Sequence, residues 1–217
     1  MNTMVRAIVL ACLVSLYAVS HARGQDKYYA VIFGVQDAAN RFNQAHSFAT
    51  FVRAQREPAK IIDQATISWL PAAGIVDLKN RAERGTNHTF KNSFEIVTRA
   101  QSVAQWGPFE VREELFDRAK RQDQLLKRGG ILYKAVDLTT RPGGVAINCE
   151  HSISDIVRNP GEPFVRTGTA RGHRGSFLVA EHLRPWMIEP NTVHGWLDAP
   201  LGLEAYTIIK KSWNWPN

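Results

Sequence analysis

The chain has 217 residues, and its 27 lysines and arginines against 20 aspartates and glutamates give a formal net charge of +7 at neutral pH. This length is enough for one domain with a well-buried core. Only two cysteines are present, which excludes a small scaffold held together by several disulfides.

The first segment has the pattern of a secretory signal peptide. Arg6 precedes an apolar run over residues 7–19, and Ser20-His21-Ala22 supplies small residues at the positions that specify cleavage. The run is too short for a transmembrane helix, and no later run is long enough to span a bilayer. A lipoprotein-type cleavage at Cys12 would leave a very short apolar stretch. We therefore expect cleavage after Ala22 and a secreted or periplasmic protein.

Removal of residues 1–22 would leave Cys149 as the single cysteine and a formal charge of +6 (27 − 1 − 20). An unpaired cysteine in an exported protein calls for an explanation, and one explanation is that its thiol is reactive. The basic balance suits a position beside an anionic envelope surface, although solubility alone also explains it. Export argues against a nucleic-acid partner. No repeat or low-complexity linker interrupts residues 23–217, so we expect a single domain.

Strand patterns dominate the first half of this domain. Residues 28–35 form a nearly continuous apolar run, typical of a buried strand, and residues 46–52 are rich in aromatic and β-branched side chains. Strand character returns over residues 61–70, which predicts a hairpin with the preceding strand. Apolar residues at helical spacing predict a helix within residues 92–105, ended by Trp106-Gly107-Pro108-Phe109.

Helices are more frequent in the second half, which makes the class α+β. The clearest helix covers residues 110–128 and ends at Gly129-Gly130, before a strand over residues 131–137. Another begins at Asn148, a favoured N-cap residue. The remaining elements follow in order: a loop over 159–163, a loop over 171–175, a helix over 176–186 and a strand over 206–211.

The position of Cys149 in the first turn of a helix favours a reactive thiol. Unpaired N–H groups and the positive end of the helix dipole lower the pKa of a thiol and increase the thiolate fraction. A buried apolar cysteine is the alternative. A thiolate hydrolase also needs a base. His151 lies two residues further along the helix, turned by about 200°, whereas His46 begins a predicted strand and is the better candidate base or a satisfied core residue.

Asn148-Cys149-Glu150-His151 resembles the motif around the nucleophile of the lecithin:retinol acyltransferase group, a circularly permuted branch of the NlpC/P60 papain-like superfamily. In that group a helix and a Leu-Tyr-Lys-type strand precede the cysteine, as Ile131-Leu132-Tyr133-Lys134 and the helix before it do here. The base of that group begins an early strand, the place that His46 occupies, 103 residues before the cysteine (149 − 46). The resemblance covers residues 28–158.

This resemblance implies a papain-like antiparallel sheet or small barrel packed against helices, followed by a C-terminal extension of unknown role from about residue 159. The sequence departs from the group in two respects. Ser152-Ile153 follows the motif where lipid-acting members have Phe-Val, and no second histidine lies on the strand after His46. We expect Ser68 to take the place of that histidine, with Thr66 as an alternative and Gln64 as a weaker one.

The resemblance implies an exported cysteine hydrolase or acyltransferase that acts on an amide or ester bond of a cell-wall peptide or a lipid acyl group. His46 would deprotonate Cys149, and the thiolate would form an acyl-enzyme, without a metal or an organic cofactor. The alternative is a catalytically inactive binding module on the same fold. A metal site is a third hypothesis, weakened because Cys-x-His lacks the paired spacing of zinc motifs. Its ligands would come from Cys149, His151, His173, His182 and His194.

Overall fold

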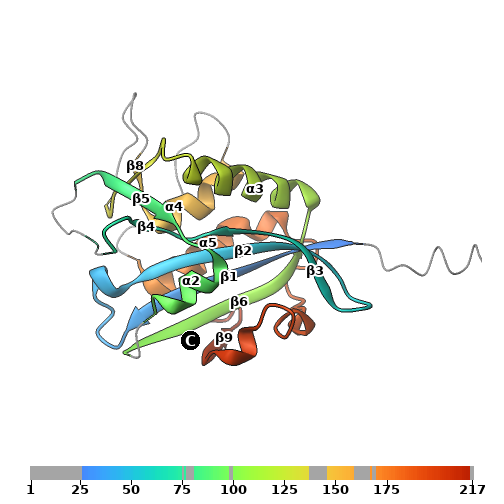
Figure 1. The fold of residues 1–217 in the computed structure, drawn as a ribbon. Helices are drawn as coiled ribbons and strands as arrows, with labels where there is room; N and C mark the ends of the chain where they lie inside the picture. The colour runs from blue at the N-terminus through green and yellow to red at the C-terminus, as the bar shows by residue number, and fades with distance from the viewer. Residues whose placement is uncertain are drawn as a thin grey trace, which may run out of the picture.

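The computed structural model describes residues 26–74, 76, 81–97, 100–136, 146–158, 167 and 170–215. Two mixed β-sheets, one of them curled into a half-barrel, are packed with a few helices (Figure 1). The predicted α+β class is therefore confirmed. The predicted signal peptide and the loop predicted over residues 159–163 lie outside the described residues.

The larger sheet has the strand order β3-β2-β1-β6-β9. β1 (Lys27–Asp37), β2 (His46–Gln55) and β3 (Lys60–Ile67) form an antiparallel meander, so the predicted hairpin is confirmed. β6 (Gln101–Val111) is antiparallel to the other edge of β1, and β9 (Ile208–Lys211) lies parallel to β6. β1 is therefore the central strand of this sheet.

The helix predicted within residues 92–105 is wrong over most of its length. α2 (Phe90–Glu95) is only six residues long, and β6 begins at Gln101 and includes the residues predicted to break the helix. Both faces of β6 carry buried side chains, for example Val103 and Ala104. A strand buried on both faces has no polar alternation, and short apolar runs of this kind are not distinguished from a helix by spacing.

The smaller sheet has the order β4-β5-β7-β8. Its strands are β4 (Trp69–Pro71), β5 (Glu83–Asn87), β7 (Leu132–Tyr133) and β8 (Ala146–Ile147). The strand predicted over residues 61–70 is divided between the two sheets, because Ser68 separates β3 from β4. Of the strand predicted over residues 131–137, only the two residues of β7 are extended in the described part.

The predicted helix before Cys149 is α3 (Glu113–Lys127), which starts later than predicted because β6 continues to Val111. Gly129, with a φ of 77°, follows its end as predicted. α4 (Cys149–Ser154) begins directly after the predicted N-cap Asn148. None of the helices in the described ranges is both long and apolar enough to cross a bilayer.

α5 (Gly172–Leu183) begins four residues before the predicted start, so the loop predicted over residues 171–175 is largely helical. Its N-terminal half lies against β1, where Gly34 leaves room for the helix. The short 3-10 helices of the chain are Phe42–Gln44, Asp155–Val157, Arg184–Trp186, Gly195–Leu197 and Leu203–Ala205.

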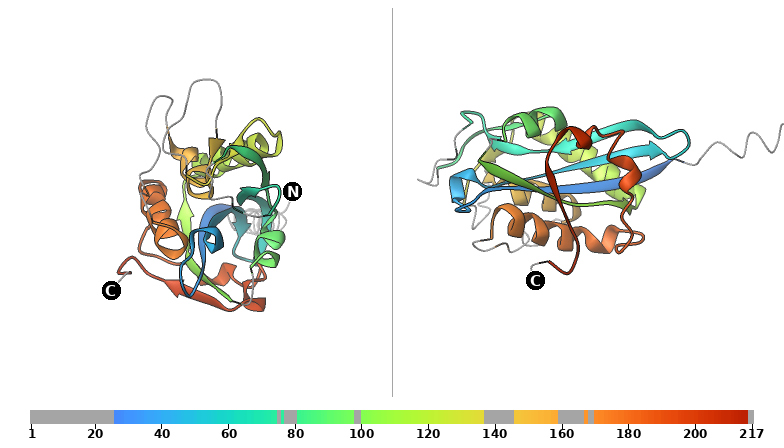
Figure 2. Two further views of the ribbon diagram at one scale, coloured as in Figure 1. Left: turned by 90° about the vertical axis from the view of Figure 1, so that its left-hand side faces the viewer. Right: turned by 90° about the horizontal axis from the view of Figure 1, so that it is seen from below.

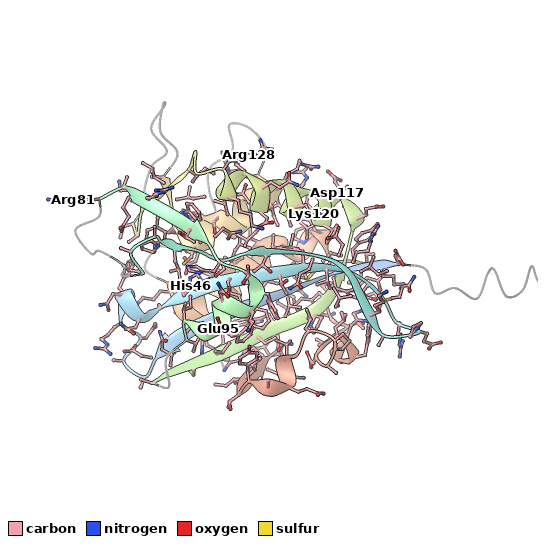
Figure 3. The ribbon with its side chains drawn as sticks, viewed as in Figure 1. His46, Arg81, Glu95, Asp117, Lys120 and Arg128 are labelled. Carbon is pink, nitrogen blue, oxygen red and sulfur yellow. The ribbon has the colours of Figure 1, made fainter. Side chains whose placement is uncertain are left out.

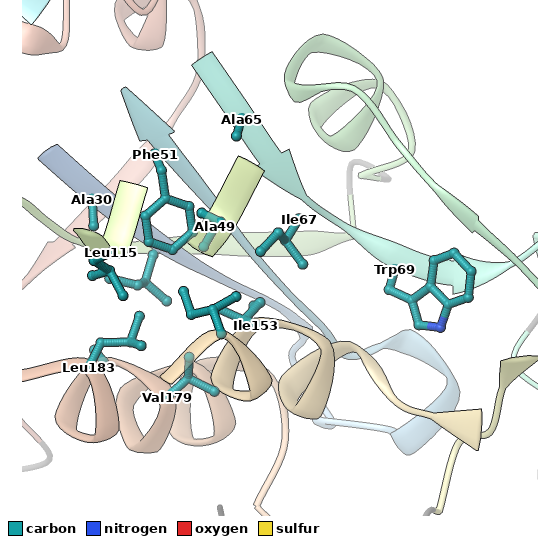
Figure 4. Close-up of a cluster of buried hydrophobic side chains, with 14 of the residues drawn as sticks. Ala30, Ala49, Phe51, Ala65, Ile67, Trp69, Leu115, Ile153, Val179 and Leu183 are labelled. Carbon is teal, nitrogen blue, oxygen red and sulfur yellow. The ribbon is translucent and has the colours of Figure 1, made fainter. Parts of the chain in front are cut away.

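Two apolar clusters cover the two faces of the larger sheet. On the face that we call the α4 face, Ile153 of α4 packs with Ala49 and Phe51 of β2, beside residues of α3 and α5 (Figure 4). On the opposite face, which we call the α2 face, Phe48 of β2 packs with Phe94 of α2. The alternation of side chains along β2 therefore assigns each residue of this strand to one face.

The segment beyond residue 159, predicted as an extension of unknown role, contributes to this core where it is described. α5 covers the sheet and β9 extends it, as the two views of Figure 2 show. The ring of Trp213 stacks on Phe109 of β6, with 5.0 Å between centroids, and Trp215 meets Trp106 edge-on at 5.8 Å. Trp213 and Trp215 thus cover the side chains of β6 and add to the core on this side of the sheet.

Gly85 of β5 allows the smaller sheet to form beside Ser68, because a Cβ at this position would lie 2.1 Å from the indole of Trp69. Trp69 is fully buried and has no room to withdraw. We expect Gly85→Ala to lower the free energy of unfolding by about 2 kcal/mol, measured by urea denaturation. Gly130→Ala is the matched control, since nothing lies within 4 Å of its added Cβ. Equal effects of the two substitutions would contradict this account.

Candidate active site

Cys149 is the first residue of α4 and is almost completely buried. The Asn148 side chain caps the helix by accepting a hydrogen bond from the N–H of His151 at 2.8 Å. The Ser152 hydroxyl donates to the carbonyl oxygen of Cys149 at 2.7 Å, and Ile153 anchors the helix in the core. The first turn of α4 therefore holds its N–H groups around the residue that carries the sulfur.

His46, the first residue of β2, forms a buried hydrogen-bonded pair with Ser68. Its Nε2 lies 3.0 Å from Oγ of Ser68, and Ser68 is fully buried (Figure 3 labels His46). The structure thus brings together these two of the three predicted site residues. The alternatives are directed elsewhere, because the hydroxyl of Thr66 and the amide of Gln64 both bond to Thr50.

Asn87 at the end of β5 fixes the backbone on either side of Ser68. Its Oδ1 accepts the N–H of Ser68 at 2.7 Å, and its Nδ2 donates to the carbonyl oxygen of Thr66 at 2.8 Å and to Asp123 of α3 at 2.7 Å. Asn87 is not among the residues that the sequence predicts for the site. No local pattern connects it to Ser68, and the signal becomes visible only once β5 is paired with β4, which places Asn87 opposite Trp69.

Burial and, to a lesser extent, the neighbouring His88 lower the pKa of His46 to about 3. The imidazole is therefore neutral at neutral pH. Nε2 is engaged with Ser68, whereas Nδ1 is buried and hydrogen-bonds to no group in the described residues. A buried nitrogen without a partner is uncommon in proteins and is a reason to look for a role for it.

In the described residues, Nδ1 of His46 makes no hydrogen bond, and Nε2 lies at hydrogen-bond distance from Ser68. The His46 ring stacks on Phe48 at 5.8 Å between centroids, so both side chains point to the α2 face. α4 packs on the other face through Ile153. α4 nevertheless contacts both β2 and β4, and Ser68 directly precedes β4. The helix with the sulfur and the His46–Ser68 pair therefore border the same short strand.

The histidines of the metal hypothesis are spread over α4 (His151), α5 (His173 and His182) and the start of the 3-10 helix Gly195–Leu197 (His194). Nε2 of His173 in α5 is 3.3 Å from the carbonyl oxygen of Ser102, and burial lowers the pKa of His173. His194 lies near Glu110, at 3.9 Å between Nε2 and the carboxylate. Within the described ranges, no group of three or more histidine, cysteine, aspartate or glutamate residues is arranged to hold a metal ion.

No family model and no curated protein matches this chain, and no solved structure matches its fold.

The depressed pKa of His46 makes stability depend on pH. The folded pKa of about 3 lies below the unfolded value, so the unfolded chain binds the proton first and stability falls as the pH drops from about 6.5 toward 3. His46→Gln can still bond to Ser68 but does not titrate. Between pH 7 and 4.5, we expect the native protein to lose about 3 kcal/mol more stability than this variant.

Urea denaturation of both proteins at the two pH values measures this difference. The other histidines titrate identically in the pair and cancel. Parallel losses of stability in the two proteins would mean that the folded chain accommodates a protonated His46.

Proposed function

We propose that this chain is an exported thiol hydrolase or acyltransferase that forms an acyl-enzyme at Cys149 and uses His46 as its base. The observation that carries the proposal is the His46–Ser68 pair. A buried, neutral imidazole is held at Nε2 by a buried hydroxyl, and its other nitrogen has no hydrogen-bond partner in the described structure. In the tautomer whose Nε2–H donates to Oγ of Ser68, the ring is oriented by a third group and Nδ1 is the nitrogen that accepts a proton, as a general base requires.

The proposal includes a papain-like fold of the permuted NlpC/P60 type. The order of elements supports it: a strand beginning at His46, a second strand leading to Ser68, α3, and then a helix beginning at Cys149. The side of the sheet on which α4 packs is the feature that agrees least with it, because His46 points to the α2 face.

In the proposed reaction, Nδ1 of His46 takes the thiol proton of Cys149, and the thiolate attacks the carbonyl carbon of the substrate. N–H groups in the first turn of α4 stabilise the oxyanion. His46 then returns the proton to the leaving amine or alcohol, and water or an acceptor cleaves the thioester. The transfer requires sulfur and Nδ1 at hydrogen-bond distance. Catalytic hydrogen bonds often tighten only in the substrate complex, so we propose that substrate draws these groups together at the start of β2.

The proposed substrates are cell-wall peptides or lipid acyl groups, reached after a leader is removed near Ala22. The formal charge of +6 on residues 23–217 (27 − 1 − 20) favours a peripheral position at an anionic envelope surface. The mechanism uses no metal ion and no organic cofactor.

A catalytically inactive binding module is the second candidate, and the environment of His46 favours it specifically. A ring whose pKa is about 3 has little tendency to take a proton at neutral pH, and its orientation toward the α2 face separates it from α4. Reactivity of the thiol distinguishes the two candidates.

We expect the alkylation rate of Cys149 to report a thiolate that forms below the ordinary thiol pKa of about 8.5. In His46→Ala the midpoint of the pH profile should rise by about one unit, because the imidazole no longer takes the thiol proton. Ser68→Ala should shift it in the same direction by less, since the ring remains but loses its orientation. Thr66→Ala, two residues before Ser68 in β3, is the matched control and should leave the profile unchanged.

The measurement is iodoacetamide alkylation of residues 23–217 against pH, followed by hydrolysis assays with short amide and acyl-ester substrates. Cys149→Ala must abolish both signals. A midpoint at the ordinary thiol value that is the same in all four proteins would overturn the catalytic proposal and leave the binding module.

A further inference from the structure

We infer that Glu150 is a positioning residue for Cys149, because its carboxylate is seated against the first turn of α5 and so fixes the start of α4. The inference rests on the proposed function, since the position of the sulfur matters only if Cys149 reacts. Glu150 would position the sulfur independently of the His46–Ser68 pair and of the N-cap residue of α4.

The Glu150 carboxylate occupies a space beside α5 that exists because residue 175 is a glycine. We call this space the seat of Glu150. Glu150 directly follows Cys149, and only 5 % of its surface is exposed. A Cβ added to Gly175 of α5 would lie 1.6 Å from Oε1 of Glu150 and 2.6 Å from its Cδ. The carboxylate therefore occupies the space that any larger residue at position 175 would need, and it lies directly on the backbone of α5.

The seat also suits a negative charge. Gly175 is the fourth residue of α5, and its N–H makes a hydrogen bond to the carbonyl oxygen of Arg171, the N-cap residue. The N-terminal end of a helix carries a positive partial charge, and in α5 the N–H of His173 is already bonded to the side chain of Gln36. A buried carboxylate is costly without compensation, and the first turn of this twelve-residue helix contributes to it.

α5 is itself fixed to the centre of the larger sheet. A Cβ on Gly34 of β1 would lie 2.0 Å from Oγ of Ser176, and that hydroxyl donates to the carbonyl oxygen of Gly172 at 2.6 Å. The side chain of Gln36 accepts the N–H of His173 at 3.0 Å. β1 fixes the first turn of α5. Because the Glu150 carboxylate lies against that turn, the start of α4 is fixed relative to the larger sheet.

The charge of Glu150 gives this role a signature beyond packing. We expect a negative charge on the residue after Cys149 to disfavour the thiolate, whereas the N-terminus of a helix favours it. A side chain that only filled space would leave the thiol titration unchanged when its charge is removed.

A double-substitution cycle on residues 23–217 tests the seat. We expect Gly175→Ala to lower the Tm by several degrees, because the added methyl group displaces the carboxylate. In the Glu150→Ala variant the carboxylate is absent and its space is vacant. Gly175→Ala should then leave the Tm unchanged or raise it, since alanine has a higher helix propensity than glycine. Equal lowering of the Tm in both backgrounds would overturn the seat.

Glu150→Gln tests the positioning role, because it keeps the size of the side chain and removes the charge. We expect the alkylation midpoint of Cys149 to fall by about one pH unit. An unchanged midpoint in Glu150→Gln, with a shifted one in His46→Ala, would overturn this inference and leave the proposed function standing. A thiol that titrates as a free thiol in every variant would overturn the proposed function, whereas the Tm cycle would still measure the seat.

Discussion

The pairing of β1 with β2 on one edge and β6 on the other is the constraint on which the rest of the structure depends. β1 is buried on both faces, with Ile32 on the α4 face and Phe33 on the α2 face. His46 of the candidate site lies opposite Val35 of β1, and α5, which contacts α4, rests on Gly34 of the same strand. A change in the register of β1 would move the base and the helices together.

The parts of the fold that the sequence predicts are those with local causes. The N-cap at Asn148, the glycine after α3 and the hairpin of β2 with β3 each depend on a few neighbouring residues. The hairpin also places His46 and Ser68, the residue directly after β3, on the same side, because side chains alternate along both strands. Two features depend on contacts between segments that are distant in the sequence, and no local pattern predicts them. They are the pairing of β9 with β6 and the start of α5 at Gly172.

The relation of Cys149 to His46 shows where sequence reasoning stops. The order of the motifs along the chain is compatible with a pair of nucleophile and base formed by Cys149 and His46. It does not determine on which face of β2 the helix α4 packs. That choice is made by Ile153, Ala49 and Phe51, which pack together on the face opposite the His46 ring. Strand parity is readable from a sequence, whereas the side on which a short helix docks is a property of the assembled core.

The larger sheet ends in β9, a strand of four residues that carries Lys210 and Lys211. An exposed sheet edge offers free N–H and carbonyl groups to strands of other molecules and so promotes aggregation. A short edge strand with charged side chains is a poor template for such pairing. The stacking of Trp213 on Phe109 anchors the residues directly after it, so β9 is held in place as a cover. The end of the chain thus protects β6 against edge-to-edge association when the protein is concentrated.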